Sequence, residues 1–424
     1  MMPARAFAGK RYVVLGLART GLSVVDYLWR SSASVTAWDD REEARALVQD
    51  KATLADPLEL DLSKYDAVVV SPGVPINTHP IAEQARAAGT PLIGDIELFA
   101  QARPELPPHK VVGITGTNGK STTTALIHHI VKTAGMPTLL GGNIGKPILG
   151  EHELEEGGVY VLELSSFQID LTQSLDCDVA ILLNITPDHL DRYDNFDAYA
   201  AAKGRLFEMQ SDNNSSIIAI DDEPSLAIAG ETGGVVIQIS AGGCMDQSNW
   251  PALQGPHNAQ NAIAAMSAAR CLGISEEAIE AGLRSFTGLP HRMERVAERD
   301  GVLFVNDSKA TNPTSTAPAL AAYPAIHWIL GGRAKSDDLD ACEPYFGHVR
   351  AAYTVGETAS MFEKLLAPSM PARNCETIRK AVRIAAEAAK PGETVLLSPA
   401  CASFDQYGDF EERGDDFRAA VGSL

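Results

Sequence analysis

The sequence predicts an α/β fold of three domains, each built around a sheet of largely parallel strands. The 424 residues are enough for two to four domains with sizeable cores. Short apolar runs alternate with helix-like segments along the chain, an order typical of parallel sheets covered by helices. Glycine-rich turns follow two of these runs, at Gly16 and at Gly116. Because such turns can bind phosphate groups at the start of a helix, they are the first candidates for ligand sites.

The first domain, predicted over residues 1–94, carries a turn of the dinucleotide-binding type. We expect strands over 12–15, 35–38 and 67–70 and a helix over 22–30. The turn Gly16-Leu17-Ala18-Arg19-Thr20-Gly21 resembles the dinucleotide fingerprint, with alanine replacing the middle glycine, and Asp39 and Asp40 follow about 20 residues later. This pattern predicts a Rossmann-like domain. The residues alone leave its ligand open between NAD, another nucleotide diphosphate such as a UDP-sugar, and none.

The second domain, predicted over residues 95–288, opens with the most informative segment of the chain. An apolar run at 111–114 leads into Thr115-Gly116-Thr117-Asn118-Gly119-Lys120-Ser121-Thr122, and a helix-like segment follows. Strand, glycine-rich turn and helix form the setting of a phosphate loop, whose backbone N–H groups point at phosphate oxygens. Lys120 is expected to reach the outer phosphates of ATP, and Ser121 to hold Mg²⁺. The general P-loop has glycine where this chain has Ile114, so the loop is a variant.

Three more polar residues of this domain are candidates, two after expected strands and one in an expected helix. Glu163 ends an apolar run, and His189 follows the next run, at 179–184. Ligands gather at the carboxyl ends of strands in open α/β sheets, so both side chains are candidates to bind Mg²⁺ beside the ATP phosphates. Lys203 lies in a helix expected over 200–209 and, taken alone, has the pattern of a surface lysine. Residues 211–255 are expected to form peripheral strands and loops.

The third domain, predicted over residues 289–424, places polar segments at strand ends. Strands are expected over 303–306, 326–330, 352–355 and 394–398, and a helix over 377–389. Polar segments follow three of the strands, at 306–313, 331–335 and 398–405. Loops in such positions commonly carry function. Arg292, near the domain junction, is suited to clamp a phosphate and Lys335 to clamp a carboxylate.

Composition excludes several classes of protein. The net charge of −20 is unsuited to a nucleic-acid-binding surface, which requires a basic face. The six cysteines are far apart and form no Cys-x-x-Cys pair, so we expect neither a zinc site nor a disulfide framework. No apolar run approaches the roughly 20 residues that span a bilayer, and no signal-peptide core is present. We therefore expect a cytoplasmic protein that does not bind membranes.

The order of the motifs resembles that of the Mur ligases along the whole chain. The resemblance rests on motifs that follow one another in the same order. They are Gly16 to Gly21, Ser71-Pro72-Gly73, Gly94 to Phe99, the P-loop, Gly142 to Gly145, Glu163 to Gln168, Asp188-His189, Lys203, His257 to Asn261, Leu289 to Arg292, Asn306 to Thr311 and Ser398 to Ser403. Two third-domain segments, Asp307-Ser308-Lys309-Ala310-Thr311 and Ser398 to Ser403, are similar to those of the D-glutamate-adding members. The resemblance implies an ATP-dependent ligase of peptidoglycan synthesis, with a Rossmann-like third domain and a P-loop mononucleotide-binding central domain. It implies the substrates UDP-MurNAc-L-Ala, D-glutamate and ATP and the cofactor Mg²⁺. We expect a monomeric chain, although the sequence does not give the oligomeric state.

The resemblance also implies a set of site residues. The catalytic residues would be Lys120, Glu163, His189 and Lys203. The metal ligands would be Ser121, Glu163, His189 and Lys203, the last as a carbamate. ATP would contact Gly116, Thr117, Asn118, Gly119, Lys120, Ser121, Thr122, Asn258, Asn261, Arg292, Asp307 and Lys309. The UDP-sugar would contact Thr20, Arg41, Ser71, Gly73, Asn143 and His189, although Asp40 stands where threonine is common. D-Glutamate would contact Thr311, Lys335, Ser403, Phe404 and Phe410.

Three other classes of protein compete with this interpretation. A dehydrogenase would account for the turn at Gly16 but would leave the P-loop without a role. A P-loop switch protein would hydrolyse nucleotide without a UDP-sugar, although the chain lacks the Asn-Lys-x-Asp guanine signature. Another Mur ligase or a folylpolyglutamate-type ligase would differ in the amino acid that it adds. The sequence alone does not fix the choice of D- over L-glutamate.

Overall fold

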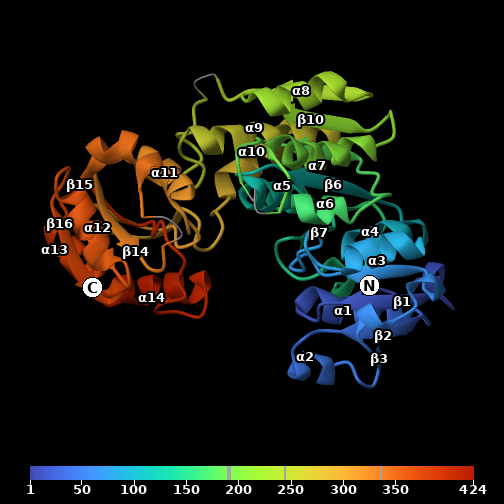
Figure 1. Ribbon diagram of the computed structural model, residues 1–424. Helices are drawn as coiled ribbons and strands as arrows, with labels where there is room; N and C mark the ends of the chain where they lie inside the picture. The colour runs from blue at the N-terminus through green and yellow to red at the C-terminus, as the bar shows by residue number, and fades with distance from the viewer. Residues whose placement is uncertain (189–191, 243–244, 335–336) are drawn as a thin grey trace. The chain divides into compact units, whose positions relative to one another are not determined.

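The computed structural model describes residues 1–188, 192–242, 245–334 and 337–424. These residues form two compact units, one of Met1–Cys244 with Gln260–Gly282 and one of Met245–Ala259 with Leu283–Leu424. Three sheets make up the α/β fold, two in the first unit and one in the second, as Figure 1 shows. The predicted α/β class with three sheets is confirmed.

The first sheet is fully parallel, with the order β3-β2-β1-β4-β5. Its strands are β1 (Arg11–Leu15), β2 (Ser34–Trp38), β3 (Thr53–Leu54), β4 (Ala67–Val70) and β5 (Leu92–Ile93), and its helices are α1 (Arg19–Arg30), α2 (Glu42–Ala46), α3 (Ile81–Ala88) and α4 (Asp95–Ala102). Helix α1 begins three residues before the predicted start because the turn after β1 is very tight. A Cβ on Gly21 would lie 1.8 Å from the Gly16 carbonyl oxygen, so only glycine fits there.

The second sheet is also parallel, with the order β11-β10-β9-β6-β8-β7. Its strands are β6 (His109–Thr115), β7 (Thr138–Gly142), β8 (Gly158–Glu163), β9 (Val179–Leu182), β10 (Ser215–Ala219) and β11 (Val235–Ile239). Its helices are α5 (Lys120–Thr133), α6 (Ser166–Asp170), α7 (Phe196–Glu208), α8 (Glu223–Glu231), α9 (Pro256–Cys271) and α10 (Glu276–Ser285). Strands β6, β8 and β9 are almost wholly buried, as their continuous apolar runs predict. The last two strands lie at one edge, where the sequence predicts peripheral strands.

The third sheet has the order β12-β13-β17-β14-β15-β16, and β12 alone pairs antiparallel. Its strands are β12 (Glu294–Arg299), β13 (Val302–Asn306), β14 (Ile326–Gly331), β15 (Val349–Val355), β16 (Ala372–Glu376) and β17 (Thr394–Leu397), and its helices are α11 (Pro313–Ala321), α12 (Ala359–Leu366), α13 (Ile378–Ala388) and α14 (Phe410–Gly422). Strands β12 and β16 are not predicted, because as edge strands they are polar and partly exposed.

Separate hydrophobic cores cover the two faces of the third sheet. One core joins α11 and α12 to Val305, Trp328 and Leu330. The other joins α13 and α14 to Phe304, Ile329 and Val395. Because consecutive strand residues point to opposite faces, this arrangement fixes the register of β13, β14 and β17. The loops that follow these three strands therefore meet at one edge of the sheet.

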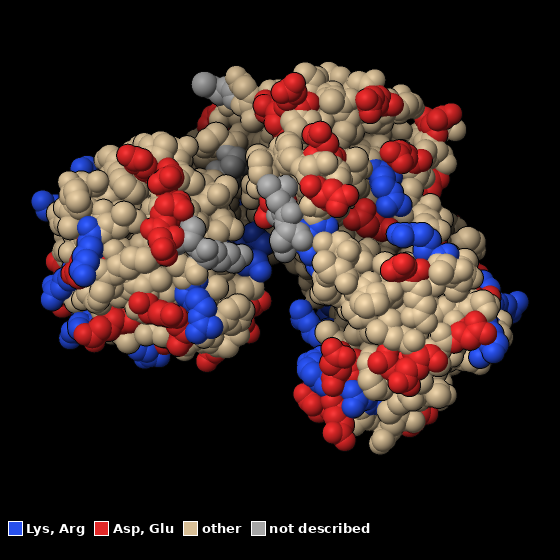
Figure 2. Space-filling view, in the orientation of Figure 1, with Lys and Arg blue, Asp and Glu red and all other residues tan. Residues whose placement is uncertain are grey.

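The surface and the helices agree with the sequence composition. Asp and Glu side chains are spread over the face shown in Figure 2, where Lys and Arg of the described residues form no continuous band. Within the described part of the chain, no helix is both long enough and apolar enough to cross a membrane.

Candidate functional site

The phosphate loop joins β6 to α5, as its sequence predicts. Gly116 and Gly119 have φ of +142° and +85°, a backbone region that favours glycine. A Cβ on Gly119 would lie 2.3 Å from Asn261 Oδ1, which also accepts a hydrogen bond from Thr123 Oγ1. Lys120 Nζ donates to the carbonyls of Gly116 and Thr117, at 2.9 and 2.8 Å. The loop is thus folded with its lysine held across it, and Asn261 braces it from α9.

The end of β9 supports the same loop from the other side. Thr117 N and Asn118 N donate to the carbonyl and side-chain oxygens of Asn184, both at 2.8 Å. Ser121 is buried in the first turn of α5, and Thr122 follows it. The predicted phosphate-binding segment, from Gly116 to Thr122, therefore has the strand–turn–helix geometry that anion binding requires.

Glu163 is the last residue of β8, and its buried carboxylate is a candidate metal ligand. Its side chain is 3% exposed, and Oε1 accepts a hydrogen bond from Asn143 Nδ2 at 3.0 Å. Among the described residues, Oε2 has no hydrogen-bond partner. A buried carboxylate oxygen without a donor is costly unless a cation or a donor joins it. The position therefore fits a Mg²⁺ ligand, which prefers oxygen.

Lys203 is buried, although its local sequence resembles that of a surface lysine. It lies on α7 and is 1% exposed. Its Nζ donates to the Gly116 carbonyl at 2.8 Å and lies 4.6 Å from the ring centre of Tyr199. Burial, and to a smaller extent the Lys120 ammonium, holds the pKa of Lys203 well below its usual range. The structure thus brings Lys203 to the phosphate loop.

Metal ligation by ordinary side chains is sparse in this region. His189 lies outside the described residues, and the residues that the structure describes contain no group of three His, Cys, Asp or Glu suited to a metal. Glu163 is a buried carboxylate at the end of β8, the strand beside β6 and its phosphate loop. A carbamate on Lys203 would add a second anionic oxygen ligand, which is the role that the sequence resemblance assigns to it.

A cavity of 340 Å³ lies within the first unit, between the turn after β1 and the loop after β7. Four of the predicted UDP-sugar contacts line it: Thr20, Ser71, Gly73 and Asn143. Ser71 Oγ donates to the Gly16 carbonyl at 2.7 Å, which fixes the turn. The cavity thus brings together the predicted diphosphate turn and the end of β7.

Arg41 differs from the other predicted UDP-sugar contacts. It is not among the residues that line the cavity, and its Nε donates to Asp39 Oδ1 at 3.0 Å. Asp39 also accepts from Leu17 N, and these bonds, that from Arg41 first, lower the pKa of Asp39 to about 2. Asp39 lines this cavity and a neighbouring one of 270 Å³, although it is not among the predicted site residues. The signal in the sequence is that Asp39 follows the Gly16 turn by about 20 residues, the spacing of the acidic residue in the dinucleotide fingerprint.

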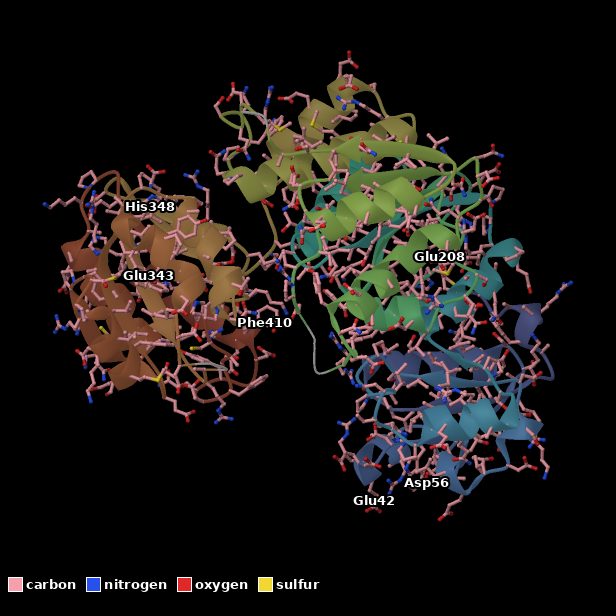
Figure 3. The ribbon with its side chains drawn as sticks, turned by 45° about the horizontal axis from the view of Figure 1, so that its top comes forward. Glu42, Asp56, Glu208, Glu343, His348 and Phe410 are labelled. Atoms are coloured by element: carbon pink, nitrogen blue, oxygen red, sulfur yellow. The ribbon has the colours of Figure 1, made fainter. Side chains whose placement is uncertain are left out.

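The loops after β13 and β17 carry most of the remaining predicted residues, all within the second unit. Asp307 is 6% exposed and accepts from Ser398 Oγ at 2.7 Å. Lys309 Nζ lies 3.8 Å from the ring centre of Phe410, the first residue of α14, which Figure 3 labels. Ser403 is buried, whereas Phe404 is 63% exposed. Thr311 is half-buried, and Lys335 lies outside the described residues.

The predicted ATP contacts are divided between the two units. Asn261 and the phosphate loop belong to the first unit, and Asn258, Arg292, Asp307 and Lys309 belong to the second. Asn258 Nδ2 donates to the Gln254 carbonyl at 3.0 Å, within the second unit.

The buried Asp307 carboxyl gives a testable pH dependence of stability. Burial raises the pKa of Asp307 to about 7 from an unfolded value of 3.8. The native state therefore binds the proton more tightly, and stability falls as the pH rises between these values. We expect Asp307→Asn to raise the free energy of unfolding at pH 8 by about 1–4 kcal/mol and to change it little near pH 4. Urea unfolding at the two pH values tests this, and a stability loss at pH 8 would contradict it.

The comparisons define the class of protein. Residues 10–94 match the model "Mur ligase MurD-like, N-terminal domain", residues 114–250 the "Mur ligase middle domain" and residues 291–401 the "Mur ligase, glutamate ligase domain". The chain belongs to the Mur ligase family. Its relatives include proteins named UDP-N-acetylmuramoylalanine--D-glutamate ligase. The protein from Novosphingobium aromaticivorans is 62% identical, over 100% of this chain and 97% of its own. The protein from Sphingopyxis alaskensis is 58% identical over 100% of both chains.

Solved structures share the fold at lower identity. UDP-N-acetylmuramate-alanine ligase from Thermotoga maritima aligns with a TM-score of 0.58 and 16% identity, over 98% of this chain and 99% of its own. The D-alanyl-D-alanyl ligase of the same family from Acinetobacter baumannii aligns with a TM-score of 0.62 and 18% identity, over 97% and 93%. These likenesses support the three-sheet fold.

Proposed function

We propose that this protein joins D-glutamate to UDP-N-acetylmuramoyl-L-alanine at the expense of ATP, in peptidoglycan synthesis. The observation that carries the proposal is the full-length identity of 62% to a relative named for this ligation. The phosphate loop, the cavity beside Ser71 and the segment from Asp307 to Thr311 are consistent with three substrates of these kinds. The proposed domains are residues 1–94 for the UDP-sugar, 95–288 for ATP and 289–424 for the amino acid. We propose that the protein is cytoplasmic, because ATP and the nucleotide-linked substrate are small soluble molecules. We also propose that the chain acts as a monomer.

The residues present fit ATP with Mg²⁺. The backbone N–H groups from Gly116 to Ser121 and the Lys120 ammonium would hold the phosphates. Ser121, Glu163, His189 and a carbamylated Lys203 would hold the metal, Glu163 through the oxygen that has no hydrogen-bond partner among the described residues. Bound there, Mg²⁺ would neutralise charge on phosphoryl oxygens; Ser121, Glu163 and the carbamate would supply the oxygen ligands that it prefers, and His189 would supply a nitrogen.

The chemistry follows from the poor reactivity of a carboxylate. The carboxylate oxygen of the L-alanyl group attacks the γ-phosphorus of ATP, the P–O bond to ADP breaks, and an acyl phosphate forms. The amine of D-glutamate then attacks the acyl carbon, the amide forms, and inorganic phosphate and a proton leave. In this proposal Lys120 stabilises charge on the transferred phosphoryl group. Holding the reactants side by side replaces bimolecular encounters, an effect worth ~7 kcal/mol or more.

Omitting each substrate in turn tests the proposed function. Phosphate release is measured with ATP, UDP-MurNAc-L-Ala and D-glutamate, and then with each one left out. We expect steady release only with all three present, and a product heavier by one glutamyl residue. Equal release without the UDP-sugar would instead favour a P-loop switch or hydrolase, and ligation of another amino acid would favour a sister ligase.

Two third-domain substitutions test the amino-acid site. We expect Thr311→Ala and Lys335→Ala to raise the KM for D-glutamate much more than the KM for ATP. For Lys335 the expected rise is roughly 10- to 150-fold, because a charge-assisted contact to a carboxylate is worth ~1.5–3 kcal/mol. Steady-state kinetics with each substrate varied in turn provides the measurement. Equal changes in all three KM values would show a folding or closure defect instead.

A further inference from the structure

Arg413 is a buried arginine that contacts the loop carrying several of the predicted site residues. It lies on α14 and is 2% exposed. Its Nε donates to Ser308 Oγ at 3.0 Å, and its Nη2 donates to the Ser308 carbonyl at 2.8 Å. Ser308 Oγ in turn donates to the Phe410 carbonyl at 2.8 Å. The guanidinium therefore holds the segment between Asp307 and Thr311 against the start of α14.

The same guanidinium lies against the loops that follow β14 and β17. Nη1 lies 3.5 Å from the Gly331 carbonyl. A Cβ on Gly332 would meet Arg413 Nη1 at 3.2 Å, the Cys401 Cβ at 3.2 Å and the Ala402 carbonyl at 2.3 Å. The backbones of Arg333 and Ala402 pair beside this point. Arg413 thus lies where three loops meet at the carboxyl ends of β13, β17 and β14.

The positive charge of Arg413 is not cancelled by a direct ion pair within the part of the chain that the structure describes. Its hydrogen-bond acceptors there are carbonyl and hydroxyl oxygens. Among the described residues, the charges of the Asp405 and Asp307 carboxylates act on Arg413, but neither carboxylate forms an ion pair with it. Burial lowers the pKa of Arg413 to about 10, so the group remains charged at neutral pH. A buried cation with neutral partners is unfavourable unless an anion approaches it.

We propose that Arg413 is a positioning residue for the amino-acid substrate: it joins the three loops and supplies an uncancelled positive charge that favours a dicarboxylate amino acid. The inference rests on the proposed function, because it assumes that the glutamate pocket is formed by these loops. An attacking glutamate with a neutral amine carries two negative charges, so a cation behind the loops favours its binding. The UDP-sugar, which we assign to the first domain, depends much less on Arg413. Of the predicted ATP contacts, Asp307 and Lys309 lie on the segment that Arg413 holds, whereas the phosphate loop does not, so we expect ATP to depend on Arg413 less than D-glutamate does.

Substitution of Arg413 with and without retention of charge tests the inference in the full-length protein. Arg413→Gln removes the charge and keeps hydrogen-bonding capacity, and Arg413→Lys keeps the charge but loses the planar fork. We expect the KM for D-glutamate to rise about 10- to 100-fold in Arg413→Gln and about 3- to 10-fold in Arg413→Lys. The KM for the UDP-sugar should stay within threefold of wild type in both variants, and the KM for ATP should rise by a smaller factor than the KM for D-glutamate.

Arg418→Gln is the matched control on the same helix. Arg418 is already neutralised by Glu294 and Asp415, each at 2.6 Å, so its loss should leave the KM for D-glutamate within threefold. An unchanged KM in Arg413→Gln, equal changes for all substrates, or a Lys variant no better than Gln would overturn the inference. If Arg413→Gln fails to fold, the KM values of Arg413→Lys provide the test: a rise for D-glutamate that exceeds the rise for ATP supports the inference, and equal changes overturn it. Failure of the wild type to use D-glutamate would instead overturn the proposed function.

Discussion

Replacement of Lys203 by alanine should reduce ligation to a trace, and a small carboxylate such as acetate should restore part of it. The reason is that Lys203 is buried against the phosphate loop, where a free ammonium beside Lys120 and a divalent cation would be repelled. Reaction of the neutral amine with CO₂ forms a carbamate, which is anionic and an oxygen ligand. The lowered pKa of Lys203 favours the neutral amine that this reaction requires. Acetate in the space left by Lys203→Ala could replace the missing carboxylate.

Two further variants separate the carbamate from a packing role. Lys203→Met fills a similar volume without charge, so it should fold with equal or greater thermal stability and still be inactive. Lys203→Arg should be inactive and should not respond to acetate, because its bulk and charge remain. Steady-state phosphate release with and without acetate provides the measurement, and ¹³C NMR with labelled CO₂ detects the carbamate directly. Full activity of Lys203→Ala would rule out the carbamate role.

Replacement of Lys120 by alanine should lower kcat/KM for ATP-dependent ligation by at least about 10²- to 10³-fold. Losing a fixed positive group that stabilises charge in the transition state has an effect of this size. The fold should persist, because the hydrogen bonds described for Lys120 Nζ go to the carbonyls of Gly116 and Thr117, which belong to its own loop.

Lys132→Ala provides the control for Lys120→Ala. Lys132 lies in the last turn of the same helix and is exposed, so its loss should leave ligation unchanged. Circular dichroism and thermal unfolding of both variants check that the fold is retained. Near-normal phosphate release from a folded Lys120→Ala protein would contradict the assignment of this loop to ATP.

Local sequence patterns predict the elements whose burial is continuous. Strands β6, β8 and β9 have uninterrupted apolar runs, and the phosphate loop has a glycine at each position where φ is positive. The sequence does not predict the edge strands β12 and β16, because about half of their residues are exposed and exposed polar residues are typical of loops. The predicted start of α1 is three residues after the observed one, because the helix begins inside the glycine-rich turn.

The candidate site depends more on contacts between distant residues. The local sequence around Lys203 is typical of a surface lysine, whereas its buried Nζ donates to the carbonyl of Gly116, which is 87 residues away in the sequence. Arg413 gives no local signal, because the loops that surround it come from three different strands. Asp39 could be found by its spacing, but its hydrogen bonds to Leu17 and Arg41 appear only in the folded chain. Most of the predicted site residues come from the resemblance to a family, because motif spacing alone does not identify them.

The most direct test of the proposed ligation follows oxygen from the acceptor carboxylate. UDP-MurNAc-L-Ala labelled with ¹⁸O in both carboxylate oxygens is incubated with the protein, ATP and D-glutamate, and the products are analysed by mass spectrometry. Attack of the carboxylate on the γ-phosphorus predicts one ¹⁸O atom in the released phosphate and one in the new amide carbonyl. Released phosphate without ¹⁸O would contradict an acyl phosphate and, with it, the role assigned to the phosphate loop.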